Sequence, residues 1–291
     1  MSSDPREPSL PHHRRGRGRF WRPDRLLSNI GGLAGRLENR VALITGASRG
    51  IGRAIASGFA AEGAAIAVTA RTAGGLQALV AEVEQGGGRA LAIPADLADA
   101  SVPGRVVQEA LDAFGTIDVL VNNAGIGSSA DPRPVVDFDD GFWNLTLSLN
   151  LTAPYLLTKA VLPVLLAKRW GRIINIASIN GKTGSFHGAA YSASKHGLLG
   201  LTRSVALEVA RDGITVNAIC PGPVHTEMND RRLRYDAERL ALDPRDLEST
   251  LTPIGRRLEP AEIVPMAVML ASDQSAAITG QAFNVCGGIA T

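Results

Sequence analysis

The chain has 291 residues, of which 45% are hydrophobic and 20% charged, and its formal net charge is +2. This composition excludes a generally disordered chain or a fibre, and the length allows one large or two small domains with a substantial core. Apolar stretches are broken by charge or glycine before they reach the length of a membrane span. Cys220 and Cys286 lie in or beside apolar segments without metal-ligand spacing, which predicts buried free thiols in a reducing, cytoplasmic compartment and no metal site.

Positive charge is concentrated in residues 1–40, where nine arginines stand against four acids. The segment "HHRRGRGRFWRPDR" is of the kind that contacts nucleic acid or another anionic surface. A disordered extension over residues 1–39 is the favoured interpretation, and no nucleic-acid partner is expected. The stretch "LLSNIGGLAGRL" is too short and interrupted for a secretory signal, whereas an organelle transit peptide stays open.

From residue 40 onward, apolar runs alternate with turns and stretches of helical period. The opening "RVALITGASRGIGRAIASGFAAEGAAIAVTAR" predicts a strand, a glycine turn, a helix and a second strand. Further strands are predicted at 90–97, 117–125, 171–178, 214–222 and 281–288, and helices at 99–115, 140–169, 190–212 and 260–272. Strands without polar alternation are buried on both faces, so we expect a parallel sheet covered by helices. The prediction is one doubly wound α/β domain of the Rossmann type over residues 40–291.

Residues 223–259 interrupt this alternation with a polar, irregular, partly helical segment between a strand and a helix. Ligands in doubly wound folds bind outside the carboxyl ends of the strands. We therefore expect this insertion to be a substrate lid, with a solvated surface excursion as the alternative.

The stretch "TGASRGIG", residues 45–52, follows the first strand and opens the first helix. Gly46, Gly50 and Gly52 supply a turn without side chains, so that a pyrophosphate can approach backbone amides and the positive end of the helix dipole. A tight connection alone would also use glycines, but the position after the first core strand favours a dinucleotide site. Ser48 and Ile51 belong to the same expected cofactor turn.

The end of the second strand bears on the choice of nucleotide. An acid there would bind both ribose hydroxyls of NAD, but this chain has Ala70 and Arg71. Arg49 in the glycine turn could supply a second guanidinium for a 2′-phosphate. The sequence predicts NADP(H) over NAD(H), with ordinary surface charge as the alternative for each arginine.

A tyrosine and a lysine stand four positions apart in "YSASKHG", residues 191–197. On a helix, Tyr191 and Lys195 would lie on one face. A nearby ammonium favours the phenolate and makes tyrosine a usable acid or base. Taken alone, the pair is equally typical of a helix surface.

The order of "TGASRGIG", "NNAG", "YSASK" and "PGPVHT" resembles the short-chain dehydrogenases/reductases over residues 41–288. The resemblance implies that Ser178, Tyr191 and Lys195 are catalytic and that Asn150 completes a tetrad. Tyr191 would give a proton to a carbonyl oxygen that Ser178 binds. Lys195 would lower the tyrosine pKa and hold the nicotinamide ribose, and the Asn150 backbone would position a water.

The same resemblance implies further cofactor contacts. Asp96 matches an adenine-contacting acid, with a helix N-cap as its alternative role, and Asn122 matches a residue that braces its strand and borders the adenosine. Pro221, Gly222 and Thr226 match the turn that holds the nicotinamide, and Thr226 could also cap the lid helix.

Among subfamilies, the chain is most similar to bacterial ketoreductases of carrier-bound 3-oxoacyl chains and polyketides, so an acyl carrier protein is a candidate partner. Arg169 matches a carrier-docking arginine, but Asp212 stands where the second one is expected. His187 and His196 receive no catalytic role, although His187 could touch substrate or close the pocket. The resemblance also implies a homodimer or homotetramer built on the helices at 140–169 and 190–212.

Two other functions stay open at this stage. One is oxidation of a small alcohol, sugar or steroid by the same chemistry, and the other is a non-catalytic nucleotide-binding scaffold with a basic arm.

Overall fold

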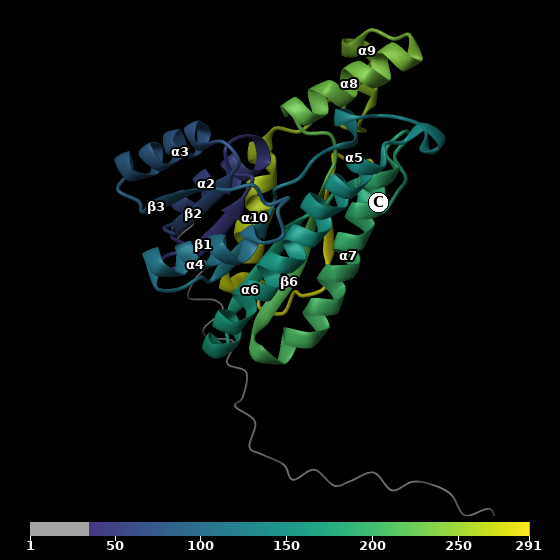
Figure 1. The fold of residues 1–291 in the computed structure, drawn as a ribbon. Coiled ribbons are helices and arrows are strands. Elements are labelled where there is room, and N and C mark those ends of the chain that lie inside the picture. The colour runs from purple at the N-terminus through teal and green to yellow at the C-terminus, as the bar shows by residue number, and fades with distance from the viewer. Residues whose placement is uncertain (1–34, 291) are drawn as a thin grey trace, which may run out of the picture. The chain divides into compact units, whose positions relative to one another are not determined.

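A computed structural model describes residues 35–290, so that most of the predicted extension at 1–39 lies outside the described residues. Seven strands form one parallel sheet in the order β3-β2-β1-β4-β5-β6-β7 (Figure 1). The predicted doubly wound α/β fold is confirmed. The strands are β1 Val41–Thr45, β2 Ala65–Ala70, β3 Ala90–Pro94, β4 Val119–Asn122, β5 Gly171–Ile176, β6 Ile214–Pro221 and β7 Ala282–Val285.

Helices follow the strands and cover both faces of the sheet. They are α2 Gly50–Ala61, α3 Ala73–Gln85, α4 Val102–Phe114, α5 Asp140–Leu147, α6 Ala153–Lys168, α7 Ala189–Val209, α8 Glu227–Leu240, α9 Pro244–Thr250 and α10 Val264–Ala271. Helix α3 is not predicted from the sequence, because its opening glycines obscure its helical period. This helix nevertheless buries Leu76, Leu79 and Val83.

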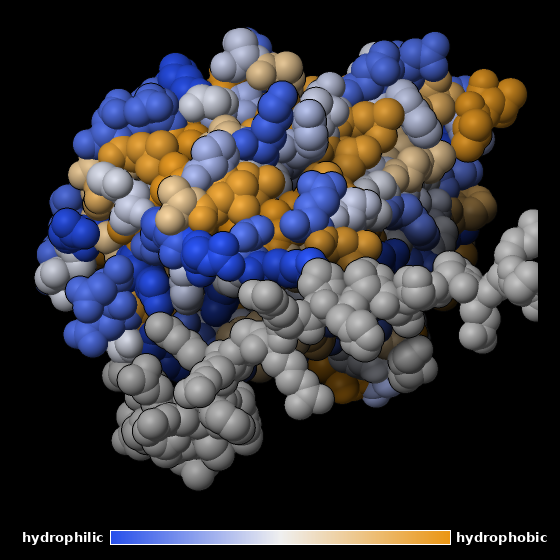
Figure 2. All heavy atoms as spheres, turned by 90° about the horizontal axis from the view of Figure 1, so that it is seen from below, coloured by the Kyte–Doolittle hydropathy of each residue, from blue (hydrophilic) through white to orange (hydrophobic). Residues whose placement is uncertain are grey.

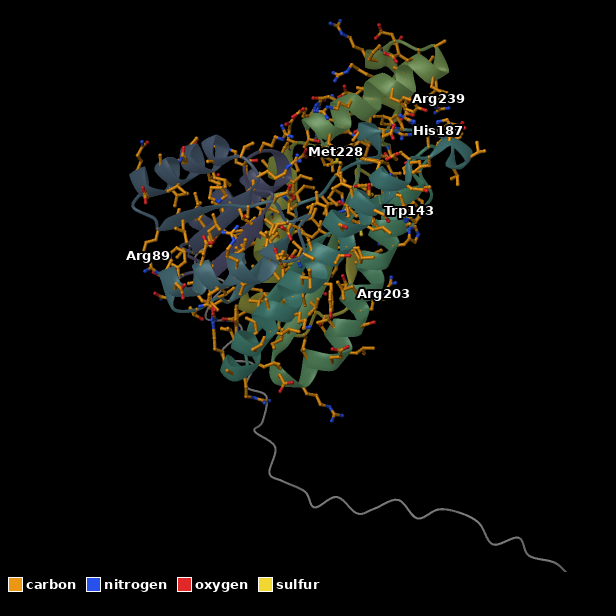
Figure 3. All side chains as sticks on the ribbon, viewed as in Figure 1. Arg89, Trp143, His187, Arg203, Met228 and Arg239 are labelled. Atoms are coloured by element: carbon orange, nitrogen blue, oxygen red, sulfur yellow. The ribbon has the colours of Figure 1, made fainter. Side chains whose placement is uncertain are left out.

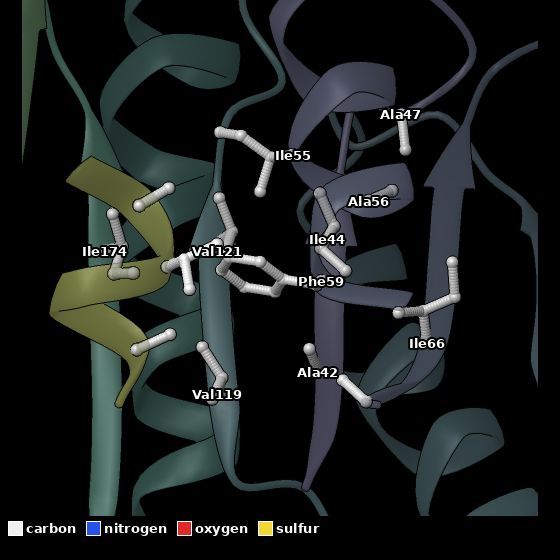
Figure 4. Packing of buried hydrophobic residues seen from close by; sticks show 14 of the residues in the cluster. Ala42, Ile44, Ala47, Ile55, Ala56, Phe59, Ile66, Val119, Val121 and Ile174 are labelled. Atoms are coloured by element: carbon white, nitrogen blue, oxygen red, sulfur yellow. The ribbon is translucent and has the colours of Figure 1, made fainter. Parts of the chain in front are cut away.

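The apolar strands bury side chains on both faces, as expected for a covered parallel sheet. Within β1, Ala42 and Ile44 belong to one apolar cluster and Leu43 to the other. The first cluster lies under α2, α3 and α10, where the fully buried ring of Phe59 packs against the strands (Figure 4). The second lies under α4, α6 and α7. Cys220 and Cys286 are buried free thiols, as predicted.

The segment Asp140–Lys168 is 29 residues long and apolar enough to pass for a membrane span by composition. It lies on the sheet and buries Leu157, Val161 and Leu165 in the second cluster, which identifies it as a core helix. The predicted single helix is interrupted by a π-helical turn, Ser148–Thr152, between α5 and α6. Such turns widen the backbone locally and are frequent at functional sites.

An inserted segment after β6 carries α8 and α9 at the carboxyl edge of the sheet (Figure 1). Leu233, Ala237 and Leu247 form a small apolar cluster with Leu251 that is separate from the two clusters on the sheet. The two helices therefore have a core of their own.

The opposite, amino edge of the sheet carries a charged cluster. Arg172 is buried, donates to the carbonyl oxygen of Ser272 at 3.1 Å and lies over the ring of Trp170. Burial lowers the pKa of Arg172 to about 10, against the opposing field of Asp273. Seen from below, the molecule presents apolar areas bordered by hydrophilic ones (Figure 2). The buried polar contacts at this edge stabilise the amino ends of the strands, opposite the carboxyl edge.

The packed domain begins before residue 40, the predicted boundary. Leu37 is fully buried in the first cluster, and its N–H donates to the carbonyl oxygen of Glu62 at 2.9 Å. Arg36 and Glu62 form an ion pair beside it.

Replacing Leu37 by alanine should lower the free energy of unfolding by about 2 to 4 kcal/mol, because it leaves a cavity in the core. Urea denaturation followed by far-UV circular dichroism measures the change. Val136→Ala, at a position 88% exposed, should stay within about 0.5 kcal/mol of wild type. Equal stability of the two variants would show that Leu37 does not belong to the core.

Candidate functional site

A cavity of about 1130 Å³ opens at the carboxyl edge of the sheet, between the glycine turn, the ends of the strands, α7 and α8. Ser178, Tyr191 and Lys195 all line it. So does every predicted cofactor residue except Gly52 and Asn122. The fold therefore brings predicted residues from six separate stretches of sequence to one site, as the carboxyl edge of a doubly wound sheet does.

The glycine turn lies against the backbone that follows β4. A Cβ on Gly46, whose φ is +66°, would lie 2.8 Å from the Cα of Ala124. A Cβ on Gly52 would lie 2.3 Å from Nδ2 of Asn123 and 2.4 Å from the carbonyl oxygen of Gly46. Only glycine fits at these positions, so the backbone amides stay accessible from the cavity.

Asn123 and Thr45 fasten the turn to β4. The Asn123 amide donates to the carbonyl oxygens of Thr45 at 2.8 Å and Gly46 at 3.2 Å, and Oγ1 of Thr45 accepts from the backbone N–H of Asn123 at 2.9 Å. The residue predicted from the sequence is the neighbouring Asn122. Asn122 is buried behind the cavity wall and donates to Oδ1 of Asn175 at 2.8 Å. It braces its strand as expected but does not border the cavity, because successive strand residues point to opposite faces.

The residues predicted to bind the adenosine half lie at the cavity rim. Arg71 is exposed at the end of β2, and Arg49 makes an ion pair with Glu227 at the start of α8. Asp96 accepts from the N–H of Ala98 at 3.1 Å, which makes a local turn. Its alternative role as N-cap of α4 is excluded, because Ser101 holds that position.

Lys195 is a buried cation. Its side chain reaches from α7 to the carboxyl end of β5, where Nζ donates to the carbonyl oxygen of Ile176 at 2.8 Å. Burial lowers its pKa to about 8. Because an ammonium has three N–H donors, two remain for acceptors that a ligand can supply.

Tyr191 lies one helical turn before Lys195, with Nζ of Lys195 5.8 Å from its ring centroid. Enclosure by the protein raises the pKa of Tyr191, and a hydrogen bond with Ser178 opposes that rise. The predicted lowering of this pKa by Lys195 is not seen, because the loss of hydration raises it and the opposing contribution comes from Ser178. The phenol is the proton-bearing form at neutral pH.

Asn150 is fully buried in the π-helical turn and does not line the cavity. Its Oδ1 accepts from the N–H of Ile126 at 2.8 Å, and its Nδ2 donates to the Ile126 carbonyl oxygen at 2.9 Å and to Oγ of Ser194 at 3.1 Å. The side chain thus ties the α5–α6 junction to the segment after β4 and to α7. Satisfying local bonds was its alternative role, and the side chain fulfils it.

The turn after β6 completes the wall. A Cβ on Gly222 would lie 2.9 Å from the Cα of Cys286, so this position also requires glycine. Thr226 caps α8 by accepting from the N–H of Asn229 at 3.3 Å, and it lines the cavity as well. Both roles considered for Thr226 are therefore compatible with its position.

Other predicted residues lie outside the cavity. Arg169 donates to Oδ1 of Asp212 at 3.0 Å and to the Arg211 carbonyl oxygen at 2.9 Å, so its guanidinium is already engaged within the protein. His187 hydrogen-bonds to the hydroxyl of Tyr235 on α8. His196 is exposed and bonds to the Ser192 carbonyl oxygen at 2.9 Å.

These residues fit a nicotinamide dinucleotide. The glycine turn leaves room that any Cβ would fill, and the buried ammonium of Lys195 has donors to spare beside it. Sequence reasoning missed Asn123 and the α8 side chains that line the cavity, Arg232 and Asp236 among them. Within residues 35–290, no group of three or more His, Cys, Asp or Glu side chains is placed to hold a metal ion.

Comparisons with known proteins agree on the protein family that this chain resembles. Residues 40–236 match the family model described as short chain dehydrogenase. The ketoacyl reductase 1 assigned to the granaticin polyketide synthase of Streptomyces violaceoruber is 42% identical over 260 residues, which cover 88% of this chain and 94% of that protein. A 3-oxoacyl-[acyl-carrier-protein] reductase of Synechocystis is 41% identical, over 87% of this chain and 98% of that protein. A single-residue variant of the actinorhodin polyketide ketoreductase, solved with NADPH, is 38% identical, with a TM-score of 0.82 over 88% of this chain and 99% of that one.

Gly52→Ala should weaken binding of NADPH and NADH at least tenfold, because the new methyl group displaces Asn123 or the Gly46 carbonyl and distorts the turn. Fluorescence titration of the reduced nucleotides measures the affinity. Gly104→Ala is the matched control, since a Cβ there meets nothing within 4 Å. Wild-type affinity in Gly52→Ala would mean that the nucleotide does not use this turn.

Proposed function

Because this chain belongs to the short-chain dehydrogenase family and is an NAD(P)-dependent oxidoreductase acting on CH–OH and C=O groups, we propose that it reduces a 3-oxoacyl thioester or polyketide ketone to a secondary alcohol with NADPH. The observation that carries this proposal is the buried Lys195 ammonium beside the Tyr191 phenol, at the wall of a cavity that begins at the glycine turn. The names of the similar ketoreductases support the substrate class.

The glycine turn, Arg49 and Arg71 would hold the phosphates of NADPH, and Lys195, Pro221, Gly222 and Thr226 its nicotinamide half. When bound, NADPH supplies the hydride that the ketone carbon accepts. Arg71 is exposed and lines the cavity, so its guanidinium is available to a 2′-phosphate, for which arginine is well suited. Arg49 pairs with the partly exposed Glu227 and would exchange that contact for the phosphate. The NADPH-bound ketoreductase structure supports the same preference.

Tyr191 would protonate the ketone oxygen as negative charge grows on it. Because enclosure raises its pKa, the phenol keeps its proton at neutral pH and serves as an acid without prior activation. Ser178 lies at the start of the short helical turn after β5 and shares a hydrogen bond with the phenol, so it would hold the ketone oxygen against the same group. Reduction uses the phenol, whereas the reverse oxidation would use the phenolate.

Lys195 would stabilise the phenolate that remains after proton transfer. Its charged form is favoured below its pKa of about 8, so the cation is present at neutral pH. Asn150 acts differently, because its side chain is occupied by Ile126 and Ser194. Its contribution would come from the backbone of the π-helical turn, whose carbonyl groups depart from the α-helical pattern and can hold a water near Lys195.

The segment at 223–259 would act as the lid of the site, since α8 supplies cavity-lining residues from Glu227 to Asp236. Outer faces of α6 and α7 expose Tyr155 and Leu207, the latter 83% exposed, and these faces are proposed to form the contact of a homodimer or homotetramer. A carrier-bound substrate in the cytoplasm is compatible with this arrangement. Docking of a carrier protein on Arg169 is not supported, because Asp212 occupies its guanidinium.

Tyr191→Phe should lower kcat for a 3-oxoacyl thioester about 100-fold or more, since it removes the proton donor and keeps the ring. NADPH consumption in the presence of the thioester measures turnover. The control is Tyr155→Phe, which removes a half-exposed phenol from α6 and should leave kcat unchanged. Retained turnover in Tyr191→Phe would overturn the mechanism, and oxidation of small alcohols or sugars without ketone reduction would overturn the substrate class.

Arg71→Ala should weaken NADPH binding about tenfold or more while leaving NADH affinity within about twofold, because a charge-assisted contact to the 2′-phosphate is lost. Affinity is measured by fluorescence titration with both nucleotides. Arg89→Ala removes an exposed arginine outside the cavity and should change neither value. Unchanged NADPH affinity in Arg71→Ala would contradict the cofactor assignment.

A further inference from the structure

The lid helices are joined to the body of the protein by polar contacts. Their apolar side chains cluster with one another, around Leu233, Ala237 and Leu247. At their base, the buried Arg257 donates to Oδ1 of Asp230 at 2.6 Å on α8 and to Oε2 of Glu248 at 3.2 Å on α9. The lid is therefore a folded unit held together by its own apolar cluster and ion pairs.

One arginine joins three walls of the cavity. Arg232 on α8 donates from Nε to Oδ2 of Asp236 at 2.6 Å and from Nη2 to Oδ1 at 3.0 Å. The same Nη2 donates to the Phe186 carbonyl oxygen at 2.9 Å, in the loop before α7, and Nη1 donates to Oγ of Ser128 at 3.3 Å, in the segment after β4. All four residues line the cavity.

Neighbouring side chains on the same face of α8 reinforce this contact. Tyr235 and Arg239 follow Arg232 at spacings of three and seven, so they project from one side of the helix. Tyr235 bonds to His187, and the Arg239 guanidinium lies 4.3 Å from the centroid of the Phe186 ring. In Figure 3, Met228 lies toward the centre of the molecule, and Arg239 and His187 lie together toward the outer end of α8. These contacts therefore join the outer end of α8 to the loop before α7.

The four bonds use four of the five N–H donors of the Arg232 guanidinium. Its side chain is 18% exposed, and Asp236 neutralises its charge. The group is thus committed to the protein and poorly placed to bind an anionic substrate. Lysine could not replace it, because a single ammonium cannot span three walls in a fixed fork geometry.

We propose that Arg232 is a positioning residue that holds α8 against Phe186 and Ser128, closes the outer end of the substrate cavity and so makes the enzyme prefer short keto substrates. This inference rests on the proposed ketone reduction and adds the length of chain that the site accepts. The selectivity arises because a long acyl chain must displace the lid contacts before it can lie beside Tyr191, whereas a short one fits beneath them.

The test compares Arg232→Met with wild type on a series of 3-oxoacyl thioesters of increasing chain length. Arg232→Met keeps the aliphatic stem and removes all four hydrogen bonds. We expect KM for the shortest substrate to rise about tenfold with kcat within twofold, because a lost charge-assisted bond corresponds to about that factor. The ratio of kcat/KM for long over short substrates should rise about tenfold. Arg234→Met, an exposed neighbour outside the cavity lining, is the matched control and should leave both unchanged.

Two further measurements separate positioning from a general structural role. Adding methylguanidinium at millimolar concentration should restore the short-chain preference of Arg232→Met, whereas sodium chloride at equal ionic strength should not. Amide hydrogen exchange across residues 227–240 should be faster in Arg232→Met than in Arg234→Met. If Arg232→Met does not fold, Asp236→Asn, which removes the counter-charge and keeps the shape, should give the same changes at smaller size.

The outcomes distinguish the two proposals. A wild-type protein that reduces no ketone would refute the proposed function, and hydrogen exchange in α8 would still decide whether Arg232 holds the lid. Normal wild-type turnover with equal selectivity and equal exchange in Arg232→Met and Arg234→Met would overturn the role of Arg232. Equal loss of kcat/KM for all chain lengths would overturn the claim of length selection.

Discussion

The site depends on one constraint, the burial of the Lys195 ammonium at the carboxyl end of β5. An ammonium removed from water needs acceptors, and the Ile176 carbonyl oxygen provides one of them at 2.8 Å. That bond fixes α7 against the end of β5, and with α7 it fixes Tyr191. Burial disfavours the charged ammonium and lowers the lysine pKa to about 8. The remaining N–H donors of the ammonium still need oxygen acceptors. The nicotinamide ribose of a dinucleotide, whose phosphates the glycine turn would hold, would supply oxygen acceptors for these donors.

Two other buried polar contacts keep this arrangement rigid. Asn150 joins the π-helical turn to the backbone of Ile126 and to Ser194 on α7, so the helices on one face of the sheet share a connection close to the site. Asn123 fixes the glycine turn to the ends of β1 and β4. Because the partners of both asparagines are mainly backbone atoms, the geometry is set by the fold rather than by mobile side chains. Preorganised polar groups of this kind stabilise developing charge without rearrangement during the reaction.

The lid differs from this rigid half of the site. Its apolar core is its own, and its contacts with the loop before α7 come from Arg232, Tyr235 and Arg239 on one face of α8. Polar contacts at a partly exposed rim are weaker than core packing, so lid opening should cost less than disturbing the cofactor half. A rigid cofactor half and a more weakly held lid suit an enzyme that binds its cofactor at a fixed site and admits substrate when the lid opens.

The sequence by itself determined the alternation of buried strands and helices, the glycine turn and the spacing of Tyr191 and Lys195, because each follows from local periodicity or from a motif within a few residues. It did not reveal α3, whose glycines weaken the helical pattern, and it selected Asn122 where the structure uses Asn123. Only the tertiary structure decided the direction of the Tyr191 pKa, since burial depends on segments distant in sequence. The contact of Arg232 with Phe186 and Ser128 likewise joins residues 46 and 104 positions apart, which no local pattern can encode.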